Sequence, residues 1–156
     1  MIVRDEAPGD RDAVRRVEEA AFGRPLEADL VDVLRQDPAW AVSLVAEDGG
    51  EVVGHVLLTR AQLGEAGELL ALGPLAVLPD RQRSGVGGAL MLAALERADG
   101  AVVLVGHPDY YVRFGFEPAA ARGLTNQWGL AGPEWMVHGD APAGLVVYPQ
   151  PFAEIA

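Results

Sequence analysis

Apolar residues recur along the chain either at helical spacing or at the shorter spacing of strands. The helical spacing marks three helices. Residues 13–21 repeat apolar side chains at helical spacing, which predicts an amphipathic helix of about three turns with Asp10 as its N-cap. The pattern returns in residues 26–34, and Asp37-Pro38 stops this second helix because the residue before proline is pushed out of the helical region. Residues 86–98 are apolar on nearly every side, which predicts a buried helix.

Runs rich in valine and leucine mark the strands. The Asp48-Gly49-Gly50 turn between two of these runs predicts a hairpin, because glycine readily adopts the positive φ angles of tight turns. Beyond Phe116, glycines and prolines interrupt the chain repeatedly, and only two strand candidates remain there. The predicted strands are residues 2–4, 40–46, 51–60, 68–78, 101–105, 135–138 and 145–148.

The order of these elements limits the fold. It runs strand, two helices, three strands, a helix, a strand, a short helix and late strands. Antiparallel hairpins are thus combined with one strand–helix–strand crossover. We predict an α/β (α+β) fold with a mixed, mostly antiparallel central sheet and helices on both faces. No repeat or linker divides the chain, so a single domain over residues 1–156 is expected.

Composition excludes several classes of chemistry. All 12 basic residues are arginine and there is no cysteine, which rules out Schiff-base lysines, thiolate nucleophiles and cysteine-bound metals. The three histidines lack the spacing of metal ligands, so no metal is expected. A net charge of −11 disfavours nucleic acid as a partner. Without a membrane-length apolar run or a basic, apolar leader, a cytoplasmic protein with no membrane partner is expected, as a monomer or homodimer.

One segment carries most of the chemical information. A strand ending at Val77 leads into residues 79–88, here called the cradle loop, where two arginines precede three glycines at the mouth of a helix. Glycines let a ligand approach the backbone, and the free amides and dipole of a helix N-terminus favour an anion. This pattern indicates a phosphate cradle. The alternative is a glycine-rich turn that only allows the helix to pack closely on the sheet.

Two motifs in this order resemble the GCN5-related N-acetyltransferases. The first is Gln82-x-x-Gly85-x-Gly87 after a strand, and the second is the segment Tyr110-Tyr111-Val112-Arg113-Phe114-Gly115-Phe116. In detail the second motif, with His107-Pro108 before it and Trp128-Gly129 after it, is most similar to the bacterial subgroup of predicted acetyltransferases labelled YhbS-like. The resemblance covers nearly the whole chain and implies the acyl-CoA N-acyltransferase (GNAT) fold.

What the resemblance implies is an enzyme that moves an acetyl group from the cosubstrate acetyl-CoA to a primary amine by direct attack. The amides of the cradle loop would bind the pyrophosphate, with arginine side chains adding charge, and the strand before it would pair with the pantetheine arm. The implied cofactor-binding residues are Leu75, Ala76, Val77, Arg81, Gln82, Arg83, Ser84, Gly85, Val86, Gly87, Gly88 and Tyr111.

The resemblance also implies a general acid. Tyr111 matches the tyrosine that protonates the departing CoA thiolate in many members of the family. The usual base positions, two and four residues before Leu75, hold Gly73 and Ala71, which cannot accept a proton. His55 is the side-chain candidate for a base, and its alternative is a structural histidine. A chain of waters is the other route for proton removal.

Two further interpretations stay open at this point. The same fold could hold acyl-CoA without turnover, as a sensor or interaction module, or the enzyme could use another acyl donor or acceptor. Residues 1–78 carry 15 acids against 7 arginines, and this half holds the first two helices. We therefore hypothesise that Glu19, Glu27, Asp29 and their neighbours attract a cationic amine.

Overall fold

The structure is a computed structural model that describes residues 1–65 and 67–154. It contains two compact units. The first comprises Met1–Leu58 and Gly73–Arg97; the second comprises Thr59–Leu72 and the described residues from Ala98 onward. Ala66, Ile155 and Ala156, which the predicted domain includes, lie outside the described residues.

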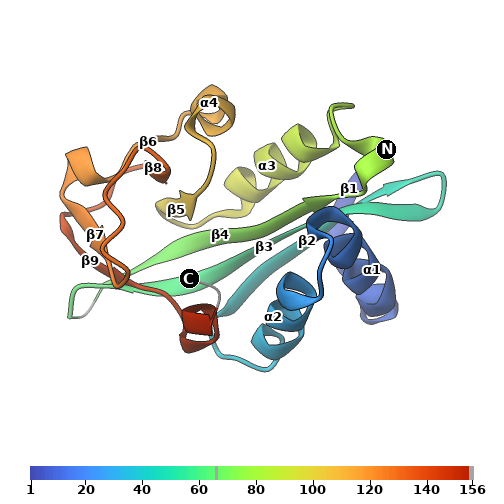
Figure 1. Cartoon of the computed structure of the whole chain (residues 1–156), viewed down its shortest axis with the longest axis horizontal. Coiled ribbons are helices and arrows are strands. Elements are labelled where there is room, and N and C mark those ends of the chain that lie inside the picture. Colours follow the sequence, from blue (N-terminus) through green and yellow to red (C-terminus); the bar gives the residue numbers. More distant parts are fainter. Residues whose placement is uncertain (66, 155–156) are drawn as a thin grey trace. The chain divides into compact units, whose positions relative to one another are not determined.

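The first unit is built on an antiparallel hairpin and its neighbours (Figure 1). β1 (Ile2–Asp5) pairs with β2 (Trp40–Asp48), with Ile2 opposite Glu47 and Asp5 opposite Leu44. β3 (Glu51–Leu63) begins in this unit and β4 (Gly67–Val77) ends in it. Gly49 and Gly50 have φ angles of +60° and +82°, so the predicted hairpin turn is confirmed, and glycine suits it because it has no Cβ to clash.

Three helices belong to the first unit. α1 (Arg11–Phe22) and α2 (Leu26–Leu34) pack against each other, and α3 (Val86–Arg97) follows the short 3₁₀ helix Pro79–Arg81. Successive residues of a strand point to opposite faces. Gly54 of β3 faces α3, and the next residue, His55, faces α1. Helices therefore cover both faces of this strand, as predicted.

Two expectations about these helices were wrong in part. The third helix is not buried on nearly every side: Leu92 is 62% exposed, because only one face of α3, formed by Val86, Leu90, Met91 and Ala94, is buried. Asp10 occupies the N-cap position of α1, but its side chain makes no cap bond. It instead accepts hydrogen bonds from the Arg4 guanidinium and the Ala7 amide.

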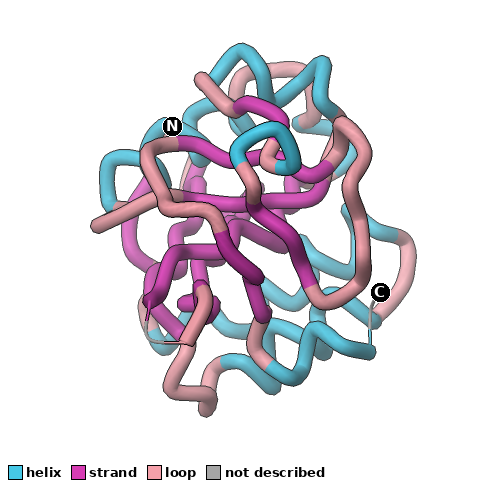
Figure 2. Tube along the Cα trace, turned by 90° about the vertical axis from the view of Figure 1, so that its left-hand side faces the viewer, coloured by secondary structure: helices cyan, strands magenta, loops and turns pink. Residues whose placement is uncertain are grey.

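The second unit holds the crossover strand and the late strands, whose helices, strands and loops can be traced in Figure 2. β5 (Val102–Val105) runs parallel to β4, with Leu70 opposite Val102, and pairs antiparallel with β8 (Trp135–His138). β9 (Gly144–Val147) pairs antiparallel with the end of β3. The predicted mixed, mostly antiparallel sheet is confirmed.

Two short strands of the second unit escaped prediction. β6 (Glu117–Pro118) pairs with β8, and β7 (Leu124–Asn126) pairs parallel with β9. Both are too short to show a periodic pattern. Trp135 and Phe116 form the buried centre of this unit, whereas Phe114 is only half-buried. The remaining helical segments are α4 (Pro108–Tyr111) and the 3₁₀ turns Val112–Phe114, Ala120–Arg122 and Gln150–Glu154.

No helix within residues 1–65 and 67–154 combines the length and apolar character that crossing a bilayer requires.

Candidate active site

The cradle loop forms an open turn before α3. Arg83 has a φ of +63°, a left-handed conformation that is uncommon for a residue with a Cβ, and Gly85 follows with +92°. The Gly85 carbonyl accepts the Ala89 amide, which starts the helix. The amides of the first helical turn have no intrahelical acceptor. The loop therefore presents a row of backbone donors at the positive end of α3, as an anion site requires.

Side chains fix the shape of this loop. Gln82 Nε2 donates to the Val77 carbonyl at 3.1 Å, and Ser84 Oγ donates to the Arg81 carbonyl. Arg81 Nη1 lies 2.7 Å from an Asp48 carboxylate oxygen at the end of β2. Among the described residues, the Arg83 side chain has no such partner and is exposed. Of the two predicted phosphate-binding arginines, Arg83 is therefore the one with a free guanidinium.

Gly54 sets how closely α3 approaches the sheet, which sequence reasoning missed. A Cβ at this position would lie 2.8 Å from Leu90 Cδ1 and 2.9 Å from Val86 Cγ1. Both distances are shorter than van der Waals contact, so with a larger residue here the Leu90 and Val86 side chains of α3 would have to shift. A glycine inside an otherwise apolar strand was the available signal, because it often marks a close approach.

The regular pairing of β4 changes near its end. Among the described residues, β4 pairs with β5 at Leu70 and Ala71, and Pro74, which has no N–H, follows shortly after. Gly73 has a φ of +142°, which favours glycine and interrupts the regular strand. Leu75 and Val77 are half-buried, and Ala76 is buried.

Tyr111 lies in the second unit, at the end of α4. Its ring makes edge contacts with Tyr110 and Phe116, with ring centroids 5.0 and 5.9 Å apart. Gly106 leaves space for the ring, because a Cβ there would overlap it. Burial raises the pKa of the Tyr111 phenol to about 12, with a smaller contribution from Tyr110. The phenol therefore stays protonated near neutral pH and is able to donate a proton or hydrogen bond.

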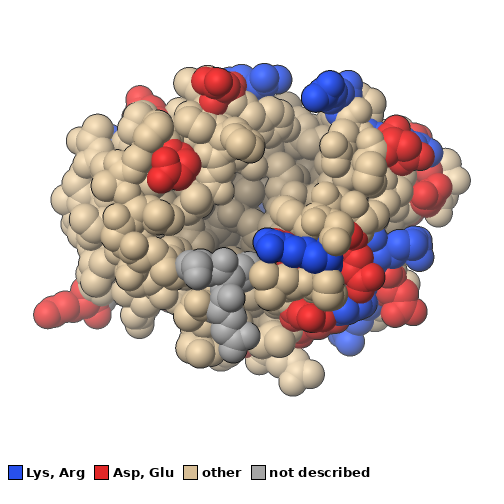
Figure 3. Space-filling model, viewed as in Figure 1, with Lys and Arg blue, Asp and Glu red and all other residues tan. Residues whose placement is uncertain are grey.

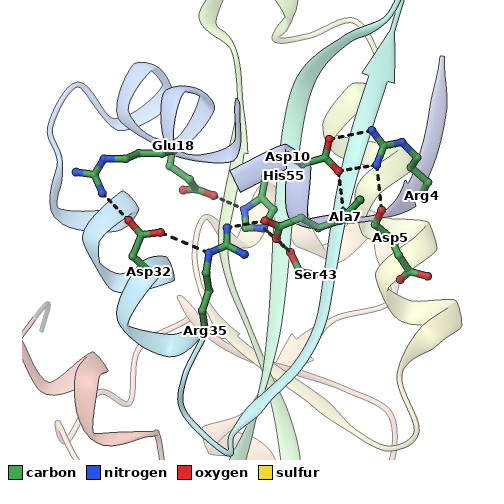
Figure 4. Close-up of polar contacts among 11 residues, drawn as sticks. Arg4, Asp5, Ala7, Asp10, Glu18, Asp32, Arg35, Ser43 and His55 are labelled. Carbon is green, nitrogen blue, oxygen red and sulfur yellow. Dashed lines mark hydrogen bonds and ion pairs between the residues drawn. The ribbon is translucent and has the colours of Figure 1, made fainter. Parts of the chain in front are cut away.

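His55 is fully buried in a chain of polar side chains, shown in Figure 4. Its Nδ1 lies 2.6 Å from a Glu18 carboxylate oxygen, and its Nε2 lies 2.8 Å from Ser43 Oγ. Ser43 Oγ in turn donates to Glu6 at 2.5 Å. Both ring nitrogens are thus engaged, which supports the structural interpretation of His55. Burial raises the pKa of Glu18, and the hydrogen bond to His55 opposes that shift.

Sequence reasoning missed Glu6, Glu18 and Ser43 as members of this chain. Glu18 and Ser43 are separated from His55 by 37 and 12 residues, so only the tertiary fold brings them together. No group of three or more histidines, aspartates or glutamates within the described residues is arranged to hold a metal ion.

The acids of α1 and α2 are largely paired. Arg15 contacts Glu19, Asp29 and Asp32 at 2.7–2.8 Å, and Arg24 contacts Glu27 at 2.5 Å. Blue and red side chains accordingly interleave over this part of the face in Figure 3. The field that these acids exert on a cationic amine is therefore weaker than their number suggests.

The fold and the cradle loop together define an α/β protein with a glycine-rich strand–loop–helix segment. The chain belongs to the GNAT family of acetyltransferases: the family model described as an acetyltransferase (GNAT) domain matches residues 39–118. The chain is 46% identical over 120 residues to a protein of Escherichia coli K12 named as the uncharacterized N-acetyltransferase YjhQ, covering 71% of this chain and 66% of that protein. It is 32% identical to YhbS of the same strain, an uncharacterized N-acetyltransferase, over 97% of this chain and 98% of the relative.

Solved structures show the same fold. The E. coli GNAT family N-acetyltransferase YhbS, in complex with CoA, matches with a TM-score of 0.91 and 30% identity over 99% of this chain and 93% of its own. A GNAT family acetyltransferase from Brucella melitensis, in complex with acetyl-CoA, matches with a TM-score of 0.82 and 34% identity over 97% of both chains. The predicted GNAT fold is confirmed.

Proposed function

We propose that the chain is a cytoplasmic, acetyl-CoA-dependent N-acetyltransferase that moves an acetyl group to a primary amine by direct attack. The observation that carries this proposal is the cradle loop, where a left-handed turn leads into the N-terminus of α3, whose first amides have no intrahelical acceptor. The two relatives with bound CoA and acetyl-CoA support it, because each matches at least 97% of this chain.

The cofactor would be held by the backbone first and by charge second. The amides from Arg83 to Gly88 would bind the pyrophosphate, and the free guanidinium of Arg83 would add a bidentate contact. Arg81, already paired with Asp48, would shape the loop and add charge. The backbone of Leu75, Ala76 and Val77 would pair with the pantetheine arm as an added strand does.

In this proposal Tyr111 is the general acid. Attack of the amine on the thioester carbon forms the amide bond and breaks the carbon–sulfur bond, and the phenol supplies the proton that the departing thiolate takes. A pKa of about 12 makes Tyr111 a weak acid but keeps its proton in place until the thiolate forms. Tyr111 would also contact the cofactor through this sulfur.

Removal of the amine proton is assigned to water. Ala71 is fully buried and Gly73 has no side chain, so neither usual base position holds a titratable group. His55 has no exposed surface, and both of its nitrogens already make hydrogen bonds. A chain of waters leading from the amine is therefore favoured over His55 as the proton acceptor.

The test is thiol release from acetyl-CoA in the presence of separate amines: polyamines, aminoglycosides, amino acids and peptides. The proposal expects release that depends on both protein and amine, with a mass increase of one acetyl group on the acceptor. Tight acetyl-CoA binding without release for any amine would support the acyl-CoA sensor instead. The missing base side chain is the observation that favours this second candidate.

A further inference from the structure

The first unit contains a second pocket, separate from the cradle loop. It has a volume of about 350 Å³ and lies where β1 ends and β2 begins. Arg81 of the cradle loop contacts Asp48 at one end of β2, whereas the pocket is lined by residues 40–43 at the other end of the same strand. At roughly 3.3 Å per residue, at least five residues of strand put about 16 Å between the two sites.

Donors dominate the polar lining of this pocket. Three arginines, Arg11, Arg35 and Arg97, outnumber the two carboxylates, Asp5 and Glu6, inside a protein of net charge −11. Both carboxylates are already committed. Asp5 pairs with Arg97 at 2.6 Å. Glu6 accepts from Ser43 at 2.5 Å and lies 2.6 Å from Arg35.

The arginines retain N–H donors that their ion pairs do not use. Arg11 is exposed and makes no ion pair with any other described residue. Arg35 is held in place by its contact with Glu6, by Asp32 at 3.4 Å and by the ring of Trp40, whose centroid lies 5.2 Å from the guanidinium carbon. Its side chain is 12% exposed, so the guanidinium is fixed but reachable from the pocket.

The remaining residues that line the pocket are apolar, so an organic ligand fits the pocket better than a bare inorganic ion does. Ala7, Pro8, Val42 and the face of Trp40 supply contact surface, and the volume is many times that of one water molecule, about 30 Å³. A carboxylate is planar and fits the fork of a guanidinium. An organic body attached to it would fill the apolar part.

We propose that this pocket is a binding site for a small organic carboxylate, held by Arg35 and Arg11 against the ring of Trp40. Glu6 and Ser43, which line the pocket, belong to the hydrogen-bonded chain that continues to His55 and Glu18, and these almost fully buried side chains hold the two in one arrangement. The site does not depend on acetyl transfer, and its occupant would bind a protein already loaded with acetyl-CoA.

The test uses nuclear magnetic resonance on the whole, ¹⁵N-labelled chain. Succinate is the probe, with its neutral diamide and inorganic phosphate as comparisons. Saturable shifts of the Trp40 indole signal are expected with succinate, while the indoles of Trp128 and Trp135 stay in place. No shift at Trp40, an equal response to the diamide, or equally strong phosphate binding would each overturn the proposal.

Variants on one helix provide the matched control. Arg11→Gln is expected to weaken succinate binding about tenfold, the effect of losing one charge-assisted contact. Arg16→Gln, an exposed arginine of α1 outside the pocket, should leave binding unchanged. Equal affinities in the two variants would overturn the assignment. Acetyl-CoA binding by Arg11→Gln should match the wild type, which separates this test from that of the proposed function.

Discussion

At the scale of single residues, burial decides what the titratable side chains of this chain are able to do. Tyr111 keeps its proton because burial raises its pKa, whereas His55 is enclosed between Glu18 and Ser43 and has no exposed surface. One is thus suited to donate and the other to hold structure. A tyrosine on an exposed surface would titrate near its ordinary pKa.

The acid role of Tyr111 predicts a change in turnover without a change in binding. Tyr111→Phe should lower kcat about 100-fold, the usual contribution of a general acid, because the thiolate then leaves without a proton donor. Tyr110→Phe is the matched control and should retain its rate. Steady-state kinetics and calorimetry with acetyl-CoA provide the two readouts. A rate for Tyr111→Phe equal to that of the control would remove the acid role.

Glu18 predicts a stability that depends on pH. Because burial raises its pKa above that of the unfolded chain, its contribution to stability is full at low pH and is lost as the pH rises through the folded pKa. Glu18→Gln keeps an acceptor for His55 without a buried charge. The stability of this variant relative to wild type should therefore increase when the pH is raised from roughly 5 to roughly 8. Chemical denaturation at both values measures this difference.

Glu19→Gln is the control for that experiment. Glu19 lies on the same helix but is 44% exposed, so its variant should follow the pH dependence of the wild type. If Glu18→Gln also followed the wild-type curve, the claim that burial shifts the pKa of Glu18 would be contradicted.

At the scale of elements, the sequence predicted what depends on local pattern and missed what depends on tertiary contact. The helices and the long strands appeared at their expected places, because periodicity and turn residues mark them. The exposed side of α3 was missed because its alanines fit water and core equally well. The short strands β6 and β7 and the polar chain around His55 join residues distant in sequence, and no local signal encodes them.

The candidate site likewise combines features that local sequence predicts with features that depend on tertiary contacts. The cradle loop could be placed because glycine spacing and a helix start are local features. That Arg81 is engaged by Asp48 while Arg83 is free could not be inferred, since Asp48 lies 33 residues away. The roles assigned to Tyr111 and to the loop amides stay predictions, for which the tests above and below are designed.

The packing of α3 on Gly54 gives a prediction about an element. Gly54→Ala should lower the free energy of unfolding by about 1–3 kcal/mol, because the added Cβ overlaps Leu90 and Val86. It should also weaken acetyl-CoA binding, since Val86 begins the helix that carries the loop amides. Gly100→Ala, where no atom lies within 4 Å, is the control. Full stability and affinity in Gly54→Ala would contradict the importance of this close approach.

At the scale of the whole molecule, the net charge of −11 conceals local differences in which charged side chains gather and how they are paired. The acids of α1 and α2 are neutralised in pairs, while the cradle loop and the pocket at the end of β1 each gather arginines. An acidic protein with two local concentrations of donors is suited to bind small anions selectively. We still expect its overall negative field to disfavour long polyanions such as nucleic acids.

Thermal unfolding in the presence of acetyl-CoA tests the central claim most directly. A ligand that binds only the folded chain must stabilise it, and at about 100 times Kd the midpoint should rise by about 5–10 °C. Arg83→Ala should reduce this rise, because its guanidinium is free to contact the pyrophosphate, and Arg16→Ala should not. A midpoint unchanged by millimolar acetyl-CoA would contradict the account of the cradle loop and with it the proposed function.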